Sequence, residues 1–88
     1  MKPQQVFECV RSNIERVLKD ADRIVGIIEP DTLLNETGLD SLEWAIVVVH
    51  LQDSIGVDPF EMGVDGDLQT VGDMAHLYVA GLAQRRAA

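Results

Sequence analysis

A chain of 88 residues supports one domain, residues 1–88. So small a domain buries only about 60–65% of its unfolded surface, which leaves little room for a deep active-site cleft. The net charge of -8 disfavours nucleic acid and anionic lipid as partners, and no stretch reaches the roughly 18 apolar residues of a membrane span. The single cysteine excludes an internal disulfide, and no signal peptide is visible, so we expect a cytoplasmic monomer.

The acidity is concentrated between Ile24 and Gln84, a stretch that contains no lysine or arginine. Its eleven acids are Glu29, Asp31, Glu36, Asp40, Glu43, Asp53, Asp58, Glu61, Asp65, Asp67 and Asp73. All seven bases lie outside it: Lys2, Arg11, Arg16, Lys19, Arg23, Arg85 and Arg86. Such a surface attracts basic partners, although acidity that only keeps a small protein soluble explains the charge equally well.

Apolar residues recur at helical spacing from Val6 to Leu18, which predicts a first helix from about Pro3 to Asp20. Pro3 is tolerated there because its missing N–H would lack a partner in the first turn anyway. Cys9 lies on the apolar side of this helix, and we interpret it as a core residue rather than a nucleophile.

Residues 24–39 have no sustained hydrophobic period, and glycine, proline and asparagine interrupt them. The stretch nevertheless carries the aliphatic residues Ile24, Ile27, Ile28, Leu33, Leu34 and Leu39. We therefore expect a long connection that is pinned onto the core and contains a short helical turn. Long ordered connections in compact domains often have a function.

Asp40 is the expected N-cap of the next helix, and Glu43 follows three residues later to complete a capping box. We predict that this helix runs from Ser41 to about Ile55 and ends at Gly56. Three consecutive valines favour a strand by propensity, but the length of the segment and its cap favour a helix.

The segment from Asp58 to Gly63 repeats these start signals on a smaller scale and predicts one short helix. Thr70 and Asp73 form a third capping pair, and an apolar pattern then continues the last helix to about Gln84. The predicted fold is a small all-α four-helix bundle with a long connection between helices 1 and 2 and a short helix 3.

Ser41 stands at the positive end of its helix, where backbone N–H groups suit an attached phosphate, although capping alone is the simpler interpretation of an Asp-Ser pair. The same helix has two apolar faces. Its core stripe consists of Trp44, Val47, Val48, Leu51 and Ile55. The opposite face carries Leu42, Ala45, Ile46, Val49 and Asp53. Either the long connection covers this second face or a partner protein docks on it.

The stretch GLDSL, from Gly38 to Leu42, resembles the attachment motif of acyl carrier proteins, and the likeness extends over nearly the whole chain. EPDTLLNETGLDSLEW is similar to the loop before the modified serine of that family. SIGVDPFE resembles the segment that leads into its short third helix, and LQTVGDMAHLYVAGL is similar to the start of its last helix.

The resemblance implies that Ser41 carries 4′-phosphopantetheine, which a phosphopantetheinyl transferase takes from coenzyme A. It also implies that Asp40 assists this modification, through the magnesium that binds coenzyme A, and that Leu42 contacts the transferase. The thiol of the arm would hold an acyl or aminoacyl group as a thioester. The protein itself would not be an enzyme; it would deliver its cargo between a loading ligase or transacylase and downstream synthases of fatty-acid, polyketide or special-lipid biosynthesis.

In fatty-acid members of the family the second helix bears several acids. Here only Glu43 and Asp53 are charged along the predicted second helix. This favours a dedicated partner with an apolar docking patch over the enzymes of ordinary fatty-acid synthesis. The expected partner face consists of Leu42, Glu43, Ala45, Ile46 and Val49. The Asp-Ser-Leu form favours an acyl carrier, and an aminoacyl carrier loaded by a stand-alone ligase stays open.

Two rival classes of function remain. An enzyme is disfavoured because His50 and His76 are the only histidines and no Ser–His–acid set is legible, so no catalytic residue is assigned. No metal site is expected, since the loop that begins at Asp65 lacks the glycine and the glutamate of a calcium-binding loop. The stronger rival is a helical interaction module without a cofactor, in which Asp40 and Ser41 serve only as a helix start.

Overall fold

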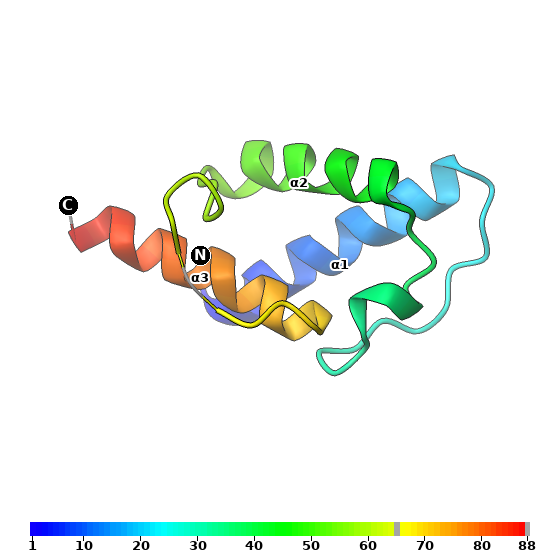
Figure 1. Cartoon of the computed structure of the whole chain (residues 1–88), viewed down its shortest axis with the longest axis horizontal. Helices are drawn as coiled ribbons and strands as arrows, with labels where there is room; N and C mark the ends of the chain where they lie inside the picture. Colours follow the sequence, from blue (N-terminus) through cyan, green and yellow to red (C-terminus); the bar gives the residue numbers. More distant parts are fainter. Residues whose placement is uncertain (65, 88) are drawn as a thin grey trace.

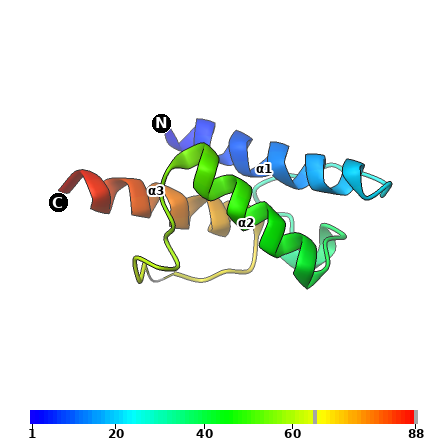
Figure 2. The same cartoon turned by 90° about the horizontal axis from the view of Figure 1, so that it is seen from above.

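Three α-helices make up the part of the chain that the computed structural model describes, residues 1–64 and 66–87. They are α1 (Pro3–Asp20), α2 (Ser41–Ile55) and α3 (Val71–Ala87), and a 3-10 helix, η1 (Leu34–Glu36), lies between α1 and α2. α1 packs against both α2 and α3 and runs in the opposite direction to them (Figure 1, Figure 2). Asp65, one of the eleven acids, lies outside the described residues.

The first two long helices have the bounds that the sequence predicts. α1 ends in a Schellman motif, in which Asp22 takes the left-handed conformation (φ 57°) and the backbone N–H of Arg23 donates to the carbonyl of Leu18 at 2.9 Å. α2 ends at Gly56, which takes the left-handed conformation (φ 88°) and whose N–H donates to the carbonyl of Gln52 at 2.9 Å.

The last helix begins with the predicted capping pair. The hydroxyl of Thr70 accepts the backbone N–H of Asp73 at 3.0 Å, and the carboxylate of Asp73 accepts the N–H of Thr70 at 3.0 Å. Asp73 also accepts the N–H of Gln69 at 3.1 Å. These backbone bonds, from Thr70 first and Gln69 second, hold the pKa of Asp73 below its ordinary value of 3.8.

The connection between α1 and α2 caps the same helix start from outside. The N–H of Val71 donates to the carbonyl of Thr32 at 2.9 Å, and the N–H of Gly72 donates to the carbonyl of Pro30 at 2.8 Å. The first N–H groups of an α-helix have no acceptor within the helix, so the connection supplies what α3 lacks. This is why residues 30–32 lie against the beginning of α3 (Figure 1).

The predicted short helix between Asp58 and Gly63 is wrong, because the segment consists of turns and the described residues form three α-helices rather than four. Asp58 does cap the segment, since its carboxylate accepts the N–H of Phe60 at 3.1 Å. The backbone bonds that follow reach back four residues from Met62, three from Gly63 and five from Val64. A helix requires one repeated spacing, and this segment is too short to establish it.

The core lies between the three helices. Its buried residues are Val6, Val10, Ile14, Val17 and Leu18 of α1, Val47, Leu51 and Ile55 of α2, Val71, Met74, Ala75 and Tyr78 of α3, with Ile28 and Val57 from the connecting segments. The expectation that the aliphatic residues of the first connection are all pinned to this core is wrong for Ile24 and Ile27, which are 95% and 86% exposed. None of the described helices combines the length and hydropathy that crossing a membrane requires.

Candidate functional site

Ser41 is the first residue of α2, and its side chain is exposed. The residue before it, Asp40, has an extended backbone (φ -85°, ψ 177°) and is the N-cap. Its Oδ1 accepts the N–H of Glu43 at 2.8 Å, and Glu43 Oε1 accepts the N–H of Asp40 at 3.0 Å. The predicted capping box is therefore complete without the Ser41 hydroxyl.

The beginning of α2 favours a negatively charged group. The N–H groups of Ser41 and Leu42 lie in the first turn and have no acceptor within the helix, while that of Glu43 is already bonded to Asp40. The helix dipole adds a positive potential at this end, and an anion there gains about 0.3–1 kcal/mol when it is exposed. An anion attached to Ser41 would meet this potential.

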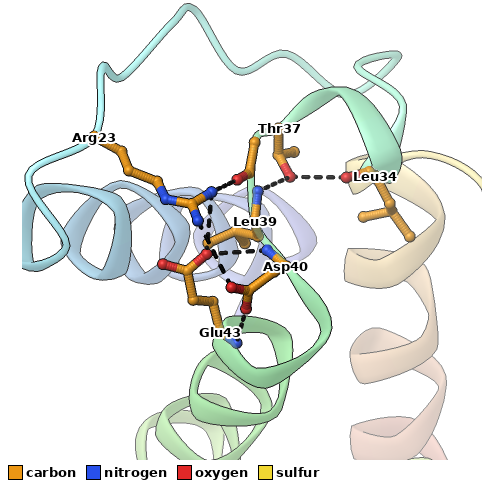
Figure 3. A network of polar contacts seen from close by, with 7 residues as sticks. Arg23, Leu34, Thr37, Leu39, Asp40 and Glu43 are labelled. Atoms are coloured by element: carbon orange, nitrogen blue, oxygen red, sulfur yellow. Dashed lines mark hydrogen bonds and ion pairs between the residues drawn. The ribbon is translucent and has the colours of Figure 1, made fainter.

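One base, Arg23, joins the end of α1 to the beginning of α2 (Figure 3). Its guanidinium donates to the carbonyl of Gly38 and forms ion pairs with Asp40 Oδ2 at 3.6 Å and Glu43 Oε1 at 3.3 Å. The side chains of Arg23 and Asp40 are 42% and 55% exposed, whereas that of Glu43 is 11% exposed. Arg23 thus balances two carboxylates, one of which is withdrawn from water.

The residues just before Asp40 are held by a second polar contact, also drawn in Figure 3. The hydroxyl of Thr37, a nearly buried residue, donates to the carbonyl of Leu34 at 2.7 Å and accepts the N–H of Leu39 at 3.5 Å. These contacts tie η1 to the chain that enters α2. Ser41 is therefore exposed but mounted on a backbone that is bonded on both sides.

An apolar cavity of about 450 Å³ opens beside Ser41. Its walls come from α2, α3, the first connection and the segment after α2. They comprise Leu34, Asn35, Leu39, Ser41, Trp44, Val48, Phe60, Leu68 and Met74. Asn35 and Ser41 are the polar members of this set. Trp44 was assigned to the core stripe, and the structure leaves it half-buried, as part of the wall.

The second apolar face of α2 is largely exposed. Leu42, Val49 and Ile46 are 72%, 58% and 41% exposed, and Ala45 is exposed between them. Glu43, which was also expected on the partner face, differs from these four residues: it is 8% exposed, because its carboxylate is used by the capping box and Arg23. The four residues Leu42, Ala45, Ile46 and Val49 form the outer face of α2.

Other residues weighed from the sequence lie away from Ser41. Cys9 is half-buried and packs against the core. His50 borders a groove between α1 and α2 together with Arg16 and Ile46, and His76 lies on α3 near the beginning of α1. Within residues 1–64 and 66–87, no group of three or more His, Cys, Asp or Glu side chains is placed to hold a metal ion.

Sequence reasoning missed two parts of this site. In the sequence Arg23 is one of seven bases, and the one signal that sets it apart is its place as the last base before the acidic stretch. Phe60 and Leu68 of the cavity wall were not singled out because they belong to a segment without regular periodicity. No pattern in the sequence connects them to Ser41, since the contact arises only when the segment folds back over α2 and α3.

Comparison with known proteins gives one clear likeness. No family model matches the sequence, and no curated protein matches it. Among solved structures, the chain is similar to the solution structure of MacpD, an acyl carrier protein from Pseudomonas fluorescens involved in mupirocin biosynthesis. The two sequences are 32% identical, the TM-score is 0.75, and the match covers 86% of this chain and 69% of that one.

Proposed function

The chain belongs to the acyl carrier protein family, and we propose that it carries an acyl group on a 4′-phosphopantetheine arm attached to Ser41. The observation that supports this site most directly is the exposed Ser41 side chain at the first position of α2, beside a capping box that does not use it. Membership of the family supports the attachment chemistry, and the exposure of Ser41 supports its choice as the attachment residue.

The residues around Ser41 fit such an attachment. Ser41 Oγ would form a bond to the pantetheine-side phosphorus of coenzyme A, while the pyrophosphate bond breaks, adenosine bisphosphate leaves and the serine proton is released to solvent. Asp40, whose side chain is half-exposed, would assist by offering a carboxylate oxygen to a magnesium ion, a hard cation that prefers oxygen ligands. The N–H groups of the first turn would stabilise the resulting phosphodiester. When bound, the group supplies a thiol on a flexible arm.

The cavity beside Ser41 favours an acyl over an aminoacyl cargo. Its walls are almost wholly apolar, so a hydrocarbon chain entering it would gain about 25 cal/mol for each Å² of surface removed from water. The ammonium group of an aminoacyl cargo would lose its hydration there without a carboxylate among the wall residues to pair with it. We therefore propose an uncharged acyl group as the cargo.

The outer face of α2 is the surface on which we propose that partner enzymes dock. Three large aliphatic side chains, Leu42, Ile46 and Val49, are exposed along one side of the helix that begins with Ser41. A partner bound there would reach the attachment site directly. We propose a transferase, a loading enzyme and synthases of polyketide-type biosynthesis as these partners, since the similar MacpD works in mupirocin biosynthesis.

Modification of the purified protein tests the proposal. The chain is incubated with coenzyme A and a phosphopantetheinyl transferase of broad carrier specificity, and its intact mass is measured. Wild type should gain one phosphopantetheine group, and Ser41→Ala should gain none while keeping its helical content. Ser54→Ala is the matched control, since Ser54 is also an exposed serine of α2, and it should be modified like wild type.

The same measurement decides against the rival function. If wild type remains unmodified while a known carrier protein in the same tube is loaded, the attachment at Ser41 is refuted. The exposed outer face of α2 would then favour the cofactor-free interaction module. If Ser41→Ala is modified on another residue, the carrier function stands and its assignment to Ser41 falls.

A further inference from the structure

The way in which α1 ends determines where Arg23 lies. Asp22 takes a left-handed conformation, its N–H donates to the carbonyl of Lys19 at 3.0 Å, and the N–H of Arg23 donates to that of Leu18 at 2.9 Å. Both bonds of a Schellman motif are present, so the backbone of Arg23 is fixed relative to α1. Its side chain then crosses to the beginning of α2, as Figure 3 shows.

At that place Arg23 balances a concentration of negative charge. Asp40 and Glu43 lie within 3.6 Å and 3.3 Å of its guanidinium. Among residues 1–64 and 66–87, no other base lies within ion-pair distance of either carboxylate. Residues 24–84 contain no lysine or arginine that could take over this role. The charge balance of the site therefore depends on one side chain.

Attachment of the arm would change this balance. A phosphodiester on Ser41 adds one negative charge at the residue that follows Asp40 and lies two before Glu43. Three negative groups would then share the beginning of α2 with one guanidinium, which is also the side chain best suited to phosphate oxygens. Because the side chain of Arg23 is 42% exposed, packing does not fix it in one position.

We propose that Arg23 is a positioning residue for the prosthetic group, which neutralises the phosphodiester on Ser41 in addition to linking α1 to α2. This inference rests on the proposed attachment at Ser41. It separates two roles of one side chain: the forked guanidinium spans Gly38, Asp40 and Glu43, and the positive charge balances the phosphate. The first role acts in the unmodified protein, and the second acts only after modification.

The experiment measures the melting temperature of the unmodified and modified forms of each variant, after intact mass has confirmed complete modification. Arg23→Gln keeps a long polar side chain without charge, and Arg23→Lys keeps the charge without the fork. The matched control is Arg16→Gln, an exposed base of α1 that forms no ion pair among the described residues. The quantity compared is the melting temperature of the modified form minus that of the unmodified form.

For Arg23→Gln, we expect this difference to be about 2–4 °C lower than in wild type at low salt. A shift of that size corresponds to the stability that one partly exposed ion pair gives a small domain. Arg23→Lys should lower the melting temperature of both forms and keep the wild-type difference, and Arg16→Gln should also keep it. About 1 M salt should abolish the effect of Arg23→Gln, because it screens exposed charges.

An unchanged difference in Arg23→Gln would overturn the inference and leave Arg23 as a link between α1 and α2 only. A difference lowered equally in Arg16→Gln would also overturn it, because the effect would then be one of net charge. Failure of wild type to take up the group is a separate result, seen in the mass before any melting, and it refutes the proposed attachment itself.

Discussion

Gly72 of α3 allows the connection between α1 and α2 to approach more closely than any other residue would. A Cβ at this position would lie 2.7 Å from the carbonyl oxygen of Pro30 and 3.3 Å from its Cβ. The oxygen cannot simply retreat, because it accepts the N–H of Gly72 at 2.8 Å. Gly72→Ala should therefore push the connection away from α3 and weaken the bond that holds it.

The loss of stability in Gly72→Ala results from two opposing effects. Overpacking of a close contact costs about 1–3 kcal/mol, and alanine recovers up to about 1 kcal/mol of helix propensity at an interior position, less at the second residue of a helix. The net loss is about 1–2 kcal/mol, which lowers the melting temperature of a domain of this size by roughly 5–10 °C.

Two other glycines provide matched controls. Gly81, also in α3, would place a Cβ 3.4 Å from Val57, an ordinary contact, so Gly81→Ala should raise the free energy of unfolding by about 1 kcal/mol. Gly26 has nothing within 4 Å, and Gly26→Ala should change little or stabilise by about 0.4–1 kcal/mol. Urea unfolding followed by circular dichroism gives all three values. A Gly72→Ala variant as stable as Gly81→Ala would refute the close approach of Pro30.

Four further predictions concern other parts of the molecule. Tyr78 is fully buried, and its hydroxyl has no hydrogen-bond partner among the described residues. Tyr78→Phe should therefore stabilise the fold by about 1 kcal/mol in the same unfolding assay. A loss of stability would mean that the hydroxyl is bonded. Burial raises the pKa of Tyr78 to about 12. The stability that depends on a neutral Tyr78 is therefore complete below pH 10 and lost as the pH rises through 12. Ultraviolet absorbance of this single tyrosine should show no phenolate near pH 10. The pKa of Asp73 is lowered in the folded protein, so its carboxylate contributes stability that is present above pH 3.8 and is lost as the pH falls through the folded pKa. The destabilisation caused by Asp73→Asn should therefore shrink in acid. A destabilisation that does not depend on pH would contradict the charged helix cap as its cause. Ile46→Glu on the outer face of α2 should leave the melting temperature nearly unchanged and slow cargo loading by a cognate enzyme. Gln52→Glu, on another side of the helix, should not slow loading. Equal loading rates in the two variants would exclude docking on the outer face.

Local signals account for the helices that the sequence predicts correctly. The Asp40–Glu43 and Thr70–Asp73 pairs place side-chain acceptors within three residues of the groups they cap, so the information is contained in a few adjacent residues. The same logic failed after Asp58, where the cap formed and the helix did not. A cap satisfies the first N–H groups, but only a longer segment with a buried face can propagate a helix.

The surroundings of Ser41 were less accessible to sequence reasoning because they depend on contacts between distant segments. Arg23 meets Asp40 only because a non-glycine residue, Asp22, takes a left-handed conformation at the end of α1. The burial of Glu43 follows from the same contact, and it distinguishes this residue from the exposed residues of the expected partner face. Periodicity locates the faces of one helix, whereas these features are set by the pairing of two elements.

The central claim is that Ser41 is the residue that carries the cargo, and mass spectrometry of the protein isolated from the cells that make it tests this claim most directly. Residues 24–84 contain no lysine or arginine, so trypsin leaves Ser41 within one long peptide, and a second protease that cuts at acidic residues is needed to isolate it. We predict a phosphopantetheine group on the peptide that contains Ser41, with an acyl thioester at its end, and unmodified peptides for Ser12 and Ser54. A protein that is bare at Ser41, or that carries the group on either other serine, would contradict the account.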